Sequence, residues 1–90
     1  MGRSSRPRVN SAYRLETLDH EQLLYDPQQA RVLACNETAS LIWRLSDGQR
    51  TVEEIIALLA EAFPEAADTI AGDVEATLEE FARHGAIELV

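Results

Sequence analysis

The sequence has no lysine, a single cysteine and only one tryptophan among its 90 residues. Arginine therefore supplies all eight basic side chains, against sixteen acidic ones, and the formal net charge is -8. A strongly acidic chain repels the phosphates of nucleic acid and the headgroups of anionic membranes, so neither is expected as a partner. A basic or apolar peptide is the partner that this charge favours.

The scarcity of cysteine and histidine limits the chemistry that the chain can support. Cys35 alone cannot form an internal disulfide, and His20 and His84 lack the spacing of metal ligands. A nucleophilic Cys35 would need an orienting group and an oxyanion site, and the sequence identifies neither. We therefore expect no catalytic activity, no metal and no cofactor, and a structural role for Cys35.

The chain also lacks a long apolar run. No such run follows the charged start, so the N-terminus is neither a secretory signal nor an anchor, and a cytoplasmic protein is expected. Residues 1–8 combine Gly, Ser, Pro and Arg and predict a mobile basic tail. The full chain has 46% apolar and 27% charged residues, a globular composition, and the remaining residues 9–90 predict one globular domain.

Three β-prone runs open this domain. Residues 9–18 place Tyr13 and Leu15 on one face and predict a strand. Residues 22–25 and 31–35 are separated by a segment that begins with Asp26 and Pro27. This pair suits a type I turn, because proline presets φ and aspartate bonds back to the backbone. The second and third runs therefore predict a hairpin.

After Cys35 the apolar spacing becomes helical. Asn36 suits the N-cap of a first helix that ends at Asp47-Gly48. Thr51 and Glu54 have the spacing of a capping box, which predicts a second helix up to Pro64. The apolar stripes of the two helices are Thr38, Ile42 and Leu45 in the first, and Val52, Ile56, Leu59 and Phe63 in the second.

A third helix is predicted from Asp68, as its cap, to about His84. Gly85 is placed to adopt the left-handed conformation that closes a helix. Residues 86–90 alternate again and predict either a short strand or an extended tail over the core. The apolar stripe of this third helix is Ile70, Val74, Leu78 and Phe81.

Two other classes of protein share parts of this pattern. The short turn between the first two helices resembles a helix-turn-helix with the hairpin as a wing, but the second and third helices are acidic where DNA recognition needs basic or amide side chains. A winged-helix shape used for protein contact fits better. A carrier protein would need a modified serine after aspartate, and Ser40 follows Ala39 inside the first helix.

Several short motifs follow one another along the chain. They are Leu23-Leu24-Tyr25-Asp26-Pro27, Val32-Leu33, Asn36-Glu37-Thr38-Ala39, Ile42-Trp43, Leu45, Asp47-Gly48-Gln49-Arg50-Thr51-Val52-Glu53-Glu54-Ile55, Asp73-Val74, Leu78 and His84-Gly85-Ala86-Ile87. Together these motifs resemble the PqqD family over about residues 9–90. The match leaves one departure, Cys35, where the family usually has leucine before the asparagine, and this apolar exchange changes little.

The resemblance implies an α+β fold, a small winged helix-turn-helix-like domain with a three-stranded antiparallel sheet followed by three helices. It also implies a non-catalytic peptide chaperone. Such a protein binds the leader of a ribosomally synthesised precursor peptide, as in pyrroloquinoline quinone biosynthesis, and presents it to a modifying enzyme, often a radical S-adenosylmethionine enzyme. Both a monomer and a strand-exchanged homodimer are compatible with exposed sheet edges.

The resemblance also implies a binding site. The leader adds as a further strand to the third strand and lies against the third helix, with acidic side chains at the margin attracting a basic leader. Val32 and Leu33 lie on opposite faces of the strand, so only one can face the groove. The site residues expected on this basis are Ala30, Arg31, Val32, Leu33, Ala34, Asp73, Val74, Thr77, Leu78, Glu80 and Phe81.

Overall fold

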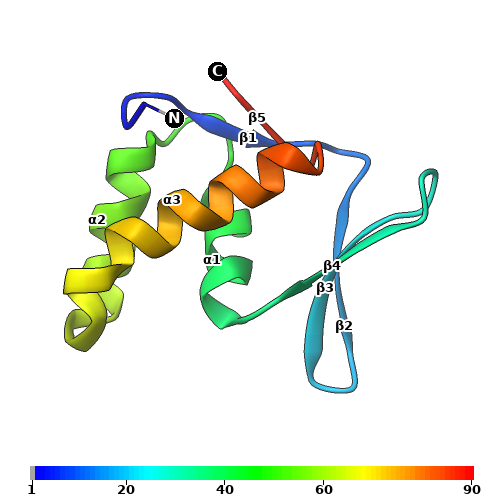
Figure 1. The fold of residues 1–90 in the computed structure, drawn as a ribbon, viewed down its shortest axis with the longest axis horizontal. Coiled ribbons are helices and arrows are strands. Elements are labelled where there is room, and N and C mark those ends of the chain that lie inside the picture. Colours follow the sequence, from blue (N-terminus) through cyan, green and yellow to red (C-terminus); the bar gives the residue numbers. More distant parts are fainter. Residues whose placement is uncertain (1) are drawn as a thin grey trace.

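A computed structural model describes residues 2–90, in which an antiparallel sheet projects from one side of a group of helices (Figure 1). The predicted α+β architecture, a three-stranded antiparallel sheet with three helices after it, is confirmed. Two further strands, β1 and β5, form a separate antiparallel ribbon. The elements are β1 (Pro7–Val9), β2 (Arg14–Leu18), β3 (Glu21–Asp26), β4 (Arg31–Cys35), α1 (Glu37–Leu45), α2 (Val52–Ala62), the 3-10 turn η1 (Pro64–Ala66), α3 (Ala67–Arg83) and β5 (Ile87–Leu89).

The strand order β2-β3-β4 and its register define two faces of the sheet. Leu24 of β3 lies opposite Leu15 and Leu33, and all three pack into the hydrophobic core. Tyr25, one residue later, points to the other face with its partners Arg14 and Val32, because side chains alternate along a strand. We call these the core face and the outer face of the sheet.

The predicted first strand, residues 9–18, is interrupted. β1 ends at Val9 and β2 begins at Arg14, with a turn between them. Asn10 makes this turn, since its side-chain oxygen accepts from the Ala12 N–H at 2.9 Å and its carbonyl accepts from the Tyr13 N–H at 3.0 Å. A local asparagine turn of this kind competes with strand pairing, which a period-two pattern does not reveal.

The β3–β4 hairpin turn forms around Asp26, as predicted. The Asp26 carboxylate accepts hydrogen bonds from the backbone N–H groups of Gln28 and Gln29, at 3.0 and 3.4 Å. Ala30 has φ +53°, in the left-handed region that a strand residue does not adopt. The expected site residue Ala30 therefore lies in the turn, and β4 begins at Arg31, as the predicted run 31–35 does.

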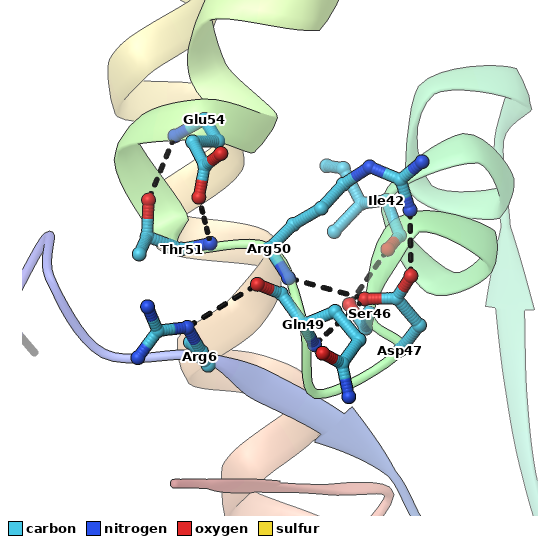
Figure 2. A network of polar contacts seen from close by, with 8 residues as sticks. All are labelled: Arg6, Ile42, Ser46, Asp47, Gln49, Arg50, Thr51 and Glu54. Atoms are coloured by element: carbon cyan, nitrogen blue, oxygen red, sulfur yellow. Dashed lines mark hydrogen bonds and ion pairs between the residues drawn. The ribbon is translucent and has the colours of Figure 1, made fainter.

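The first two helices begin with the predicted caps. The Asn36 side chain accepts from the Ala39 N–H at 2.8 Å at the start of α1. At the start of α2, the Thr51 hydroxyl accepts from the Glu54 N–H at 3.1 Å, and the Glu54 carboxylate accepts from the Thr51 N–H at 2.9 Å (Figure 2). The capping box therefore satisfies two N–H groups that a helix terminus otherwise leaves without partners.

The third helix begins differently from its prediction. Asp68 does not cap it, because α3 starts at Ala67 directly after the 3-10 turn η1, and its N-cap makes no side-chain hydrogen bond. A 3-10 turn before an α-helix carries the chain into helical geometry without a capping side chain. At the other end Gly85 has φ +73°, as the prediction of a left-handed closing residue requires.

The turn between α1 and α2 is held by Asp47 (Figure 2). Its carboxylate accepts from the Gln49 N–H at 2.9 Å and from the Arg50 guanidinium at 2.7 Å. The backbone hydrogen bond from Gln49 is the main cause that lowers the pKa of Asp47. Arg6 donates to the Gln49 carbonyl at 3.2 Å and so joins the N-terminal segment to this turn.

The N-terminal segment differs from the predicted mobile tail; Met1 lies outside the described residues. Arg6 and Val90 exchange two backbone hydrogen bonds, of 2.8 and 2.9 Å, which extend the β1–β5 pairing. The carbonyl of Ser5 accepts from the Val52 N–H at 2.9 Å, at the first turn of α2. A segment composed of Gly, Ser, Pro and Arg is expected to be solvated. These hydrogen bonds form because the fold brings the segment next to the N-terminus of α2, whose N–H groups lack partners within the helix.

Three aromatic residues connect the sheet end of the molecule to the helices. Trp43 of α1 packs against Tyr13 at a ring-centroid distance of 6.3 Å and against Phe81 of α3 at 5.8 Å, the second pair edge-to-face. All three are buried. This cluster fixes the position of the sheet relative to α3.

Candidate functional site

The sheet has two edge strands, and they differ in charge. Among residues 2–90, neither β2 nor β4 has a second partner, so the backbone N–H and C=O groups along each outer edge are open to an added strand. On the outer face, β2 presents Arg14 and Glu16, charged side chains of the kind that protect an edge from pairing. β4 presents Val32 and Ala34 there instead. The edge of β4 is the better site for an added strand.

One end of β4 is tied to the end of α3. The Arg31 guanidinium donates to the His84 carbonyl at 3.3 Å, and the Tyr13 hydroxyl donates to the same carbonyl at 2.7 Å. At the other end of β4, Cys35 lies close enough to Glu80 for the carboxylate to affect its thiol. Burial is the main cause that raises the pKa of the Cys35 thiol, and the negative charge of Glu80 adds to it.

A hollow of about 230 Å³ lies between the start of α1 and the middle of α3. Its lining includes the predicted site residues Asp73 and Thr77. With the edge of β4, this part of α3 forms what we call the β4–α3 surface, defined by Arg31–Cys35 together with Asp73, Ala76, Thr77 and Glu80. The residues that line the hollow are Asn36, Thr38, Asp73, Ala76 and Thr77.

The structure divides the predicted α3 residues into two sets. Val74 and Leu78 have no exposed surface and Phe81 is 3% exposed, so these three are core residues and do not present side chains to a ligand. The structure corrects their prediction as groove residues. They belong to the apolar stripe of α3, and this stripe packs against the core. Asp73 and Glu80 are exposed and Thr77 is half-buried.

The structure also assigns the faces of β4. Leu33 points to the core face and is half-buried, while Val32 points to the outer face and is 54% exposed. Leu33 is therefore the β4 side chain on the side of the helices. Ala34 shares the outer face with Val32, and Ala30 lies in the turn before the strand.

Asp73 and Glu80 are the charged groups of the β4–α3 surface. Neither takes part in an ion pair within residues 2–90, whereas Glu75 on the same helix is bound by Arg3 at 2.9 Å. Seven residues of helix separate the two carboxylates by about 10 Å along its axis. They are available to a basic ligand that spans several residues.

Sequence reasoning missed four residues of this region, Cys35, Asn36, Thr38 and Ala76. Ala76 follows Asp73 at helical spacing, and extending the series from Asp73 through Thr77 to Glu80 could have identified it. Asn36, which also caps α1, and Cys35 reach the region only because β4 ends where α1 begins. No local pattern in the sequence shows that junction to lie beside α3.

The alternative site at Ser40 is not supported. Ser40 is 3% exposed, and its hydroxyl donates to the Asn36 carbonyl at 3.0 Å inside α1. A buried serine within a helix cannot carry the prosthetic arm of a carrier protein. The described residues also contain no cluster of three histidine, cysteine or acidic side chains that could hold a metal ion. No helix within residues 2–90 has the length and apolarity needed to cross a membrane.

Comparison with known proteins gives the chain a family. No curated protein matches it significantly. A solved structure described as TbiB1 in complex with the TbiA(beta) leader peptide has the same fold, with a TM-score of 0.73, 21% sequence identity, and coverage of 90% of this chain and 94% of that one. The family model described as coenzyme PQQ synthesis protein D (PqqD) matches residues 21–87, from β3 to β5. The chain therefore belongs to the PqqD family.

Proposed function

We propose that this protein is a recognition element for the leader of a ribosomally synthesised precursor peptide. The leader adds as a fourth strand to the free edge of β4 and lies against α3. The observation that carries the proposal is the open edge of β4, with no charged side chain on its outer face, beside two unpaired carboxylates of α3. Membership of the PqqD family and the leader peptide in the similar TbiB1 complex support it.

Strand addition divides the work between backbone and side chains. Hydrogen bonds to the β4 backbone supply affinity for any extended segment, and alternate side chains provide selectivity. On the side of the helices, the leader meets Leu33 and Thr77, which favour an apolar side chain. Asp73 and Glu80 favour basic side chains at the margin and make binding depend on ionic strength.

The binding residues all lie within residues 9–90, the predicted domain. Residues 2–8 serve stability, because their backbone groups bond to α2 and β5 on another part of the molecule. The protein itself performs no chemistry in this proposal. It presents the bound precursor to a modifying enzyme in the cytoplasm, of which a radical S-adenosylmethionine enzyme is the kind that the family resemblance favours.

The test is a titration of the isotopically labelled full chain with a synthetic leader, taken from the precursor gene beside its own. Amide signals of β4 and α3 should shift. Those of α2, which lies on the side of the helices away from the sheet (Figure 1), should remain in place. The double variant D73N/E80Q should weaken binding about fivefold at low salt and reduce its salt dependence. The control E61Q/E65Q removes two exposed carboxylates elsewhere and should change nothing.

Two results would contradict the proposal. Shifts confined to α2 would place the site elsewhere on the molecule. The variant Ala34→Glu adds a charge to the edge of β4, and such a charge opposes strand pairing. If this variant binds the leader as tightly as the wild type does, β4 is not the acceptor strand.

A further inference from the structure

The outer face of the sheet carries an apolar hollow that the proposed leader groove does not include. Its volume is about 340 Å³, and it is lined mainly by apolar side chains. Leu18 and Val32 are 60% and 54% exposed, unusually high for large aliphatic residues. The lining residues are Glu16, Leu18, Leu23, Tyr25 and Val32.

The two sides of this face differ in polarity. The charged residues lie on β2 and at the start of β3, at Arg14, Glu16 and Glu21. On the side of β4 the face consists of uncharged side chains, Val32 and Ala34, next to Tyr25 and Leu23 of β3. The apolar part of the outer face therefore runs up to the edge of β4, the edge proposed above for strand addition.

A strand added to β4 brings side chains to both faces of the sheet. Successive residues alternate, so every second residue of the added strand lies on the outer face, about 5 Å from Val32 or Ala34. These residues cannot reach α3, which packs on the core face. An apolar side chain at such a position covers Val32 and the adjacent part of the hollow.

We infer that the leader is recognised on both faces of the extended sheet, with an apolar or aromatic leader side chain packed against Val32 and Tyr25 on the outer face. This inference rests on the proposed function and adds Val32 as a specificity-determining residue. It predicts that two neighbouring leader residues are apolar, one directed to each face of the sheet. Recognition on one face alone would require an apolar side chain only at every second leader residue.

The size of the outer face favours a peptide side chain over a folded partner. Three strands of about five residues present roughly 250 Å², since strands lie about 4.8 Å apart and rise about 3.4 Å per residue. A stable protein interface needs about 800 Å² on each partner. The net charge of -8 also opposes contact with a second copy of the chain.

The experiment compares variants of the full chain for binding to the synthetic leader used above. V32T keeps the size and β-branching of valine but places a hydroxyl in the apolar contact, and should weaken binding about fivefold. L58T makes a similar polar change at an exposed leucine of α2 and should bind as the wild type does. Thermal unfolding of both variants checks that the fold is retained.

An alanine scan of the leader then identifies the positions that face each side. Leader positions coupled to V32T in double-mutant cycles should lie an odd number of residues from those coupled to T77A, because the two sets point to opposite faces. Coupled positions of the same parity would overturn the inference.

The remaining outcomes separate the inference from the proposed function. If the leader binds the wild type and V32T equally, recognition on the outer face is wrong and strand addition stands. If no leader binds the wild type, both fail together. If sedimentation reveals a dimer that V32T dissociates, a second copy occupies the outer face and the inference is overturned.

Discussion

The β1–β5 ribbon and the β2–β3–β4 sheet are both antiparallel, but they differ in how their edges are used. β1 is bonded on both sides: β5 pairs with one edge, and on the other the Val9 N–H donates to the Ser46 carbonyl at 3.0 Å and Pro7 accepts from the Gly48 N–H at 2.8 Å. The backbone of β4 pairs with no strand other than β3 within the described residues. The comparison indicates that the ribbon serves stability, while the sheet leaves the edges of β2 and β4 without a second partner, and the proposed leader binds at the edge of β4.

The β1–β5 ribbon and the β2–β3–β4 sheet also differ in how much of their surface is buried. Pro7 and Ile87 of the ribbon are buried against the helices. In the sheet, only the core face is buried, and the outer face leaves Val32 and Leu18 exposed. If the ribbon and the sheet have these separate roles, changes in one should affect stability or binding selectively, whereas changes in the shared core should affect both.

The largest effect is expected for the shared core. W43A removes the ring that contacts both Tyr13 and Phe81 and should cost about 3–5 kcal/mol of unfolding free energy. Urea denaturation followed by circular dichroism measures this loss, and hydrogen exchange should show the ribbon and the sheet losing protection together. Continued protection of one of them would mean that the two β-structures do not depend on a common core.

A smaller effect is expected when the N-terminal segment is removed. A chain that begins at Pro7 loses four backbone hydrogen bonds, to Val52, Glu53 and Val90, and should be about 2 kcal/mol less stable by urea denaturation. Its affinity for the leader should be unchanged, because β4 lies outside this region. R3A, which removes side-chain ion pairs but no backbone bonds, is the matched control. A loss of leader affinity in the shortened chain would break the division between ribbon and sheet.

Loss of the α2 cap, next to this segment, should have a still smaller effect. T51A removes the hydroxyl that accepts from the Glu54 N–H and should cost about 1 kcal/mol of unfolding free energy. The Thr69 hydroxyl donates to the Ala66 carbonyl at the start of α3. T69A should therefore cost less unfolding free energy than T51A, because no helix N–H loses its partner. Equal losses in the two variants would contradict the capping role of Thr51.

The smallest effect is a dependence of stability on acid. The hydrogen bond from the Thr51 N–H is the main cause that lowers the pKa of Glu54 below its ordinary value of 4.5. A carboxyl with a depressed pKa stabilises the fold above that ordinary value, and this contribution disappears as the pH falls through the folded-state pKa. Stability should therefore decrease slightly between about pH 5 and pH 3. E54Q keeps an oxygen acceptor without titrating and should show a shallower decrease; an identical decrease would exclude Glu54 as the cause.

Local patterns predicted the elements whose signals are self-contained. The capping box at Thr51, the N-cap at Asn36 and the turn at Asp26 each depend on atoms within a few residues, and all three occur as predicted. The division of residues 9–18 into two strands was not predicted, because the Asn10 turn leaves the alternation of apolar residues almost unchanged.

The candidate site shows the same limit. Motifs along the chain indicated the PqqD family, and this resemblance implies a site on the third strand of the sheet and the last helix. They could not separate the residues of α3 that contact a ligand from those that fill the core. The family resemblance assigns Val74, Leu78 and Phe81 to the groove, but these residues also form the regular apolar stripe of the helix, and that regularity is what packing against the core requires.

The sequence by itself determined the net charge, the caps of the first two helices, the hairpin turn and the family, since each depends on composition or on residues near one another in the chain. Only the tertiary structure decided which strands form the sheet edges, that Leu33 faces the helices and Val32 faces outward, and that the N-terminal segment bonds to α2 and β5. These features join residues that are distant in sequence. Their physical reason is the same in each case: a backbone or apolar group finds its partner only after the helices and the sheet have packed.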